Sequence, residues 1–190
     1  MVTLLAEAPV ALAEVSAGTV DAAFRSLRHA ALPDGLVAER LIDDRHQVLV
    51  GPQHPLAAAT TVTAAELAAH PLWMPGLSDS EPVGYYEDLA ATFGLSIDTA
   101  GPSFGVEDMV AEIAASPRLA TLVGAGSHYL WPESLGLRRI PVVDPCPVYP
   151  LSLVWRRANA HPVLADFLGH LRARYRAGSA DEVWVPAWAG

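Results

Sequence analysis

The sequence predicts an α/β fold divided into two lobes. Apolar runs of strand length alternate with segments of helical spacing, which favours helices packed on a largely parallel sheet. Hydrophobic residues make up 52% of the 190 residues, mostly as small side chains that let helices approach a sheet closely. Two proline-flanked segments, near Trp73 and at residues 144–147, separate an outer part of the chain from a middle part. A chain of this length can bury the core of two small lobes.

The outer part begins with strands and helices that turn residues delimit. A helix is expected to begin at Pro9 and to end at Gly18, because glycine readily adopts the left-handed conformation at a helix end. Thr63 and Glu66 form a capping-box pattern that opens a short helix. The remaining expected strands are residues 2–6, 20–24, 36–43 and 46–50, the last two separated by Asp43 and Asp44.

The middle part and the return to the outer part follow the same rules. Helices are expected at residues 85–93, 106–115 and 163–175, and strands at 71–76, 96–100, 119–123, 137–143 and 151–155, with an irregular segment at 144–147. The first lobe then comprises residues 1–72 and 148–178, the second lobe residues 73–147, and a tail residues 179–190. Trp184 and Trp188 predict that the tail packs on the first lobe or on a partner.

The charge and the cysteine content limit the classes of function. Twelve basic residues stand against 21 acidic ones, and the basic ones are scattered, so we expect no direct nucleic-acid contact by this chain. The single cysteine, Cys146, excludes an internal disulfide and favours a reducing compartment. Neither a signal peptide nor an apolar run long enough to span a membrane is found, which predicts a cytoplasmic protein.

No pattern typical of catalysis or metal binding occurs. The seven histidines do not form the spacing of a zinc site, and Cys146 has prolines on both sides and no basic neighbour in sequence. Residues 124–126 (GAG) are too short for a dinucleotide fingerprint and more simply let a strand end approach a ligand. We therefore expect no enzyme activity, no cofactor and no metal ion.

Several short segments, in their order and spacing, resemble the effector-binding domain of LysR-type transcriptional regulators, most closely actinobacterial members. The similarity runs from about Leu4 to Tyr175. The segments that carry it are residues 18–24 (GTVDAAF), 48–50 followed by 54–57 (HPLA), 63–67, 73–76 (WMPG), 101–105 (GPSFG), and 149–156 (YPLSLVWR) followed by Asn159, His161 and Pro162.

The resemblance implies a two-lobed, periplasmic-binding-protein-like (type 2) α/β domain that binds a small-molecule effector between its lobes. It also implies self-association, as a homo-oligomer or with a full-length LysR-type subunit. The start of the chain departs from the family, because the winged helix-turn-helix, the linker helix and the first strand and helix of the effector domain have no counterpart. The expected fold is thus incomplete at the N-terminus, through truncation or because a partner supplies the missing strand.

Three short groups of residues are the candidate ligand contacts. Ser103, Phe104 and Gly105 precede a helix, where backbone N–H groups attract a carboxylate or phosphate, and the family's cleft uses this loop. The simpler alternative is an ordinary helix cap by Ser103. The other groups are Phe24, Arg25 and Ser26 after a strand end, and Pro75 and Gly76. Arg25 could pair with an acidic effector or lie free in solvent.

Two other classes of function remain open. A solute-binding protein of a transporter would share the fold, but the missing signal peptide argues against it. A small enzyme on this scaffold would need a convergent acid–base pair. Glu107 and Asp108 are the acidic pair near the expected site, and they more simply favour a helix N-terminus.

Overall fold

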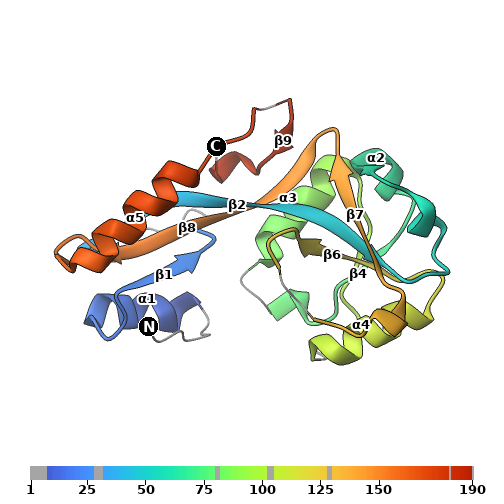
Figure 1. Ribbon diagram of the computed structural model, residues 1–190, viewed down its shortest axis with the longest axis horizontal. Helices are drawn as coiled ribbons and strands as arrows, with labels where there is room; N and C mark the ends of the chain where they lie inside the picture. Colours follow the sequence, from blue (N-terminus) through green and yellow to red (C-terminus); the bar gives the residue numbers. More distant parts are fainter. Residues whose placement is uncertain are drawn as a thin grey trace. The chain divides into compact units, whose positions relative to one another are not determined.

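The computed structural model describes residues 8–27, 32–79, 82–101, 105–127, 130–179 and 181–189 (Figure 1). The chain forms two compact units. Unit 1 comprises residues 1–43, 150–177 and 189, and unit 2 comprises residues 44–149, 178–188 and 190. The expected strand at residues 2–6 lies outside the described residues.

The first division falls between Asp43 and Asp44, whereas the sequence predicted it near residue 73. The reason is strand β2 (Leu36–Val50), one strand of fifteen residues that runs through both units where the sequence predicted two. Consecutive side chains of a strand point to opposite faces, so two neighbouring aspartates need not break it. Asp43 is paired with Arg40 at 2.6 Å, and Asp44 accepts a hydrogen bond from the Gly126 N–H at 2.8 Å. Residues 44–72 therefore belong with the middle part of the chain.

Unit 1 is a small sheet covered on both faces by helices. Its elements are α1 (Ala8–Ala17), β1 (Ala22–Arg25), the first part of β2, the last part of β8 (Cys146–Arg156) and α5 (Pro162–Arg174). Strand β8 lies between β1 and β2, and β1 is antiparallel to it. Leu153 packs with α5 residues and Val154 packs with Val15 of α1. Because these two neighbours point to opposite faces, α1 and α5 cover different sides of the sheet (Figure 1).

Unit 2 contains a larger sheet with the order β3–β7–β2–β6–β4–β5. Its strands besides β2 are β3 (Val62–Thr63), β4 (Leu72–Trp73), β5 (Ile97–Asp98), β6 (Ala120–Gly124), β7 (Arg138–Val143), the start of β8, and β9 (Val183–Trp184). Its helices are α2 (Ala64–Leu67), α3 (Val83–Phe93) and α4 (Val106–Ala115). Short 3-10 segments cover Pro55–Ala58, Leu77–Asp79, Glu133–Leu135 and, at the chain end, Ala187–Ala189.

The sheet of unit 2 is mixed, not largely parallel as predicted. Strand β2 is antiparallel to β6 and β7, whereas β4 is parallel to β5 and β6. Val48 of β2 packs in the core that contains Tyr85 of α3, and Leu49 packs with Val110 and Ile113 of α4. Alternation along β2 therefore places α3 and α4 on opposite faces of the sheet.

Local signals fixed several element ends as predicted. The Thr63 side chain accepts from the Glu66 N–H, and the Glu66 carboxylate accepts from the Thr63 N–H, which completes the capping box. Gly94 ends α3 with φ 67°. The prediction of an irregular segment at 144–147 was wrong for Cys146 and Pro147, which begin β8. A proline is tolerated there because the neighbour of β8 at this point is the two-residue strand β9.

The tail packs on unit 2. Its Trp184 ring lies 5.7 Å from the ring of Tyr85 and 5.6 Å from that of Phe93, and the Trp188 indole N–H donates to Asp88 at 2.9 Å. The chain thus passes between the units a third time, after α5. Among the described residues, no helix is both long and apolar enough to cross a bilayer.

We predict that Trp184→Ala lowers the free energy of unfolding by about 3 kcal/mol, because it removes a large ring from the core beside α3. Trp188→Phe is the comparison variant: it removes the hydrogen bond to Asp88, worth about 1 kcal/mol, and only part of a ring that packs against the same core, so its loss should be smaller. Urea denaturation followed by circular dichroism measures both. Equal midpoints for Trp184→Ala and the parent chain would show that the tail does not contribute to the core.

Candidate functional site

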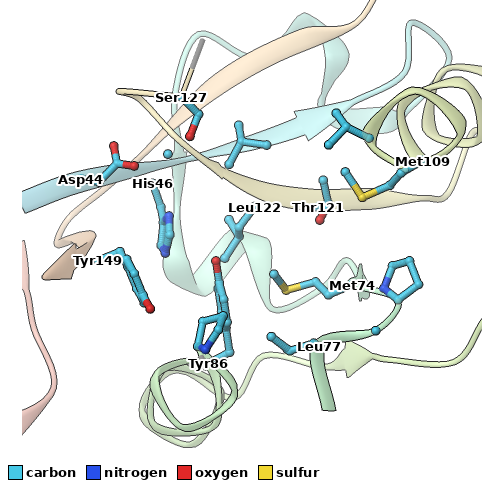
Figure 2. Close-up of a pocket in the computed structure, with 16 residues that line it drawn as sticks. Asp44, His46, Met74, Leu77, Tyr86, Met109, Thr121, Leu122, Ser127 and Tyr149 are labelled. Carbon is cyan, nitrogen blue, oxygen red and sulfur yellow. The ribbon is translucent and has the colours of Figure 1, made fainter. Parts of the chain in front are cut away.

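Unit 2 contains a pocket of about 410 Å³ (Figure 2). It is lined by β2 residues Asp44 and His46, by the loop after β4, by the first residues of α3 and α4, by β6 and the residues after it, and by Tyr149 of β8. A volume of this size suits a small metabolite.

The pocket opens where two neighbouring strands diverge. Strand β4 pairs with β6 at Leu72 and Ala120, and the chain then leaves the sheet at Met74 while β6 continues to Gly124. Beyond that pair, the described residues give this edge of β6 no neighbouring strand. Ligands of α/β proteins bind at such openings beyond the carboxyl ends of parallel strands.

His46 is the most unusual side chain of the pocket. The residue is only 3% exposed. The imidazole stacks on the Tyr86 ring, with 5.7 Å between ring centres, and meets the Tyr85 ring edge-on, with 5.4 Å between centres. Neither ring nitrogen makes a hydrogen bond of good geometry among the described residues, and the backbone of Val123 makes only a weaker polar contact with the ring. Burial lowers the pKa of His46 to about 4, and a weaker polar contact with the backbone of Val123 opposes this only in part. The imidazole is therefore neutral at physiological pH, and its ring carries one donor and one acceptor nitrogen, both buried in the wall of the pocket.

Asp44 is held against the end of β6 by a close approach. Its Oδ1 accepts from the Gly126 N–H at 2.8 Å, and a Cβ at Gly124 would clash with Oδ2. Only glycine leaves room for the carboxylate at this position. Asp44 is the one side chain with a formal charge at neutral pH in the described lining of the pocket.

The rest of the lining is mainly apolar or aromatic. In Figure 2, Met74, Leu77 and Met109 lie at the end of the pocket away from Asp44 and Ser127. The guanidinium of Arg139 lies behind the wall, where it donates to the carbonyls of Gly124 and Ser127 and lies 5.6 Å from the centre of the Trp131 ring.

Two helices begin at the pocket. Pro82 and Gly105 are the N-caps of α3 and α4, and neither helix has a side-chain cap. The first turn of α4 carries Glu107 and Asp108, as the sequence suggested, and these acids already interact favourably with the positive end of the helix. The attraction of this helix end for an anionic ligand is weaker as a result.

The candidate residues of the second lobe meet the pocket only in part. Pro75 and Gly76 line it. Gly105 is the N-cap of α4 and is followed by Val106, which lines the pocket. Ser103 and Phe104 lie outside the described residues.

The other candidates, Phe24, Arg25 and Ser26, belong to unit 1 and do not line this pocket. Phe24 packs against the core that contains Leu153 and meets Phe167 edge-on at 6.3 Å. Their contact with a ligand stays a prediction.

Sequence reasoning missed Asp44, His46, Tyr86 and Tyr149. A signal for His46 was present, because it precedes Val48 and Val50 at the two-residue spacing of one strand face. A histidine on a face that is otherwise apolar indicates a buried polar group. Among the described residues, no three His, Cys, Asp or Glu side chains lie together as metal ligands would.

The LysR substrate binding domain family matches residues 3–176. HinK, a LysR family transcriptional regulator from Pseudomonas aeruginosa, is 20% identical over 89% of this chain and 58% of HinK, with a TM-score of 0.67. The reduced OxyR regulatory domain from the same organism is 17% identical over 87% of this chain and 78% of that domain, with a TM-score of 0.64. Full-length BenM is 18% identical over 88% of this chain and 55% of BenM, with a TM-score of 0.70. No curated protein matches the chain.

We predict that the chain loses stability as the pH falls from about 6.5 toward 4. The folded pKa of His46 lies below its unfolded value, so its contribution is complete above pH 6.5 and is lost on protonation, by up to about 3 kcal/mol. Burial and the neighbouring His70 also lower the pKa of His54, in the same direction. Denaturant unfolding at several pH values measures the slope. His46→Phe keeps the ring and should flatten it, and an unchanged slope would contradict the assignment.

Proposed function

Because the chain belongs to the LysR substrate binding domain family, we propose that the pocket of unit 2 binds the small-molecule effector of a LysR-type regulator. The family match and the likeness to solved LysR regulators confirm the predicted periplasmic-binding-protein-like fold and the predicted class, an effector-sensing regulatory domain. They do not favour the transporter alternative, and the family consists of regulators, not enzymes.

The buried His46 is the observation that carries the proposal. A buried polar group without a partner costs roughly 1–3 kcal/mol. His46 carries two such nitrogens, both buried, in the wall of a pocket large enough for a metabolite. A ligand that reached these nitrogens after a small movement of the ring would supply the missing hydrogen bonds, and binding would be more favourable as a result.

The chain spans 58% of the length of HinK, so the activity of the whole protein is also a proposal. Effector binding in unit 2 would shift the equilibrium between conformations of an oligomeric, cytoplasmic regulator. The net charge of −9 supports the view that DNA contact is made outside this chain. Effector contact by Phe24, Arg25 and Ser26 of unit 1 remains part of the proposal.

Self-association is proposed through α5 with a second copy of the chain. Val163 and Phe167 are one helical turn apart on α5 and are 64% and 42% exposed, while Leu164 and Leu168 face the core. An exposed apolar pair on a helix whose other side is buried favours a protein contact.

To test the pocket, we predict that Val106→Trp abolishes ligand binding. Val106 lines the pocket at the start of α4 and is 39% exposed, so a larger ring can fill the space without entering the core. The assay is a thermal shift with a collection of cationic, neutral and anionic metabolites. Val10→Trp, on the exposed face of α1, is the matched control and should bind normally. If no compound binds the parent chain, or if Val106→Trp binds as well as the parent, the proposal fails.

To test self-association, we predict that Val163→Asp converts a dimer to a monomer of about 20 kDa in size-exclusion chromatography with light scattering. A charge at this position would be desolvated in the interface. Leu130→Asp introduces the same charge at a 95% exposed position of unit 2 and should leave the mass unchanged. A parent chain that is monomeric at all concentrations would contradict the proposal.

A further inference from the structure

The two units differ sharply in charge. Unit 2 carries fourteen acidic residues and four arginines, whereas unit 1 carries seven acidic residues and eight arginines, and the chain contains no lysine. The pocket lies entirely within the acidic unit. The field of unit 2 therefore raises the local concentration of cations and repels anions.

The arginines of unit 2 do not reverse this field at the pocket. None of the four lines it. Arg45, Arg118 and Arg138 are exposed, Arg139 donates to the Gly124 and Ser127 carbonyls behind the wall, and the fourteen acidic residues of the unit outnumber these four arginines. The residues between 79 and 130 that lie outside the described part of the chain, 80–81, 102–104 and 128–129, include neither arginine nor lysine.

The polar end of the pocket presents acceptors. Among the described residues, Gly126 is the donor to the Asp44 carboxylate, through Oδ1, and none donates to Oδ2. His46 stands two residues along the same strand and on the same face. One nitrogen of its neutral ring is an acceptor, and both nitrogens are buried in the wall, so the ring must move slightly to meet a ligand. A carboxylate and an imidazole acceptor side by side match the several N–H donors of an ammonium group.

The opposite end matches an apolar body. Met74, Leu77 and Met109 supply flexible thioether and aliphatic surface at this end. Tyr86, and Tyr149 on the side of Asp44 and His46, supply aromatic faces (Figure 2). Methionines adapt to the shape of a ligand, and aromatic rings attract a cation as well as an apolar group. The pocket is thus polar and negative at one end and apolar at the other.

We propose that the effector is an organic cation, a protonated amine joined to an apolar or aromatic body, with its ammonium group between Asp44 and His46 and its body among Met74, Leu77 and Met109. This inference rests on the proposed function of the pocket and names the chemical class of its ligand. It differs from the acidic metabolite that the helix start suggested, since Glu107 and Asp108 occupy the first turn of α4.

Three probes of one shape and different charge test the inference. Isothermal titration of the full chain at neutral pH would compare tryptamine (cationic), tryptophol (neutral) and indole-3-acetate (anionic). Tryptamine should bind about tenfold more tightly than indole-3-acetate, the effect of one ion pair near a protein surface, with tryptophol between them. Indole-3-acetate binding as tightly as tryptamine would overturn the inference, and so would the absence of binding by tryptamine.

Asp44→Asn separates the contribution of the pocket from that of the whole unit. The asparagine oxygen still accepts from the Gly126 N–H, so the fold is retained, and tryptamine should weaken about tenfold while tryptophol changes less than about twofold. Glu112→Gln removes one charge from an exposed position of α4, away from the pocket, and should change neither. Equal losses in both variants would overturn the role of Asp44.

Failure of the inference is distinguishable from failure of the proposed function. If anionic compounds from the metabolite collection bind and Val106→Trp removes that binding, the pocket is an effector site of another charge class. If no compound binds, the proposed function itself fails.

Discussion

The pairing of β2 with β6 is the interaction on which unit 2 depends. In this antiparallel ladder Val48 lies opposite Leu122 and Leu49 lies opposite Thr121, so each strand supplies side chains to both faces. Helix α3 packs on one face and α4 on the other. The same register sets His46 opposite Gly124 at the point where β6 has lost its other neighbour. Core and pocket are therefore consequences of one alignment, and a register shift of one residue would turn His46 away from the cavity.

Elements with local signals were predictable from the sequence. The apolar spacing of α4, the capping box at Thr63 and the glycine that ends α3 act within a few residues of chain. The short strand motifs also indicated the family, which the match over residues 3–176 confirms. Strand β2 was divided in error because a pair of aspartates is typical of a turn, and their partners, Arg40 and Gly126, become evident only in the folded chain.

The site was harder to predict than the fold, because it depends on contacts between distant segments. The resemblance led to Pro75 and Gly76, which do line the pocket. It did not lead to Asp44, whose position depends on Gly124, eighty residues later in the chain. It also did not lead to Tyr149, which belongs to β8. The start of a helix suggested an anionic ligand. The electrostatic field at the pocket depends on the net charge of the whole unit, which a motif of three residues does not indicate.

The close approach of Asp44 to Gly124 ties two positions together in evolution. An alanine at 124 would place a methyl group inside the carboxylate, so it is compatible only with a shorter or differently directed side chain at 44. Substitutions at the two positions should therefore occur in pairs along a lineage. Relatives that keep both residues would have the same negatively charged end of the pocket. Relatives in which both residues have changed would lack this charge and could bind a different class of metabolite.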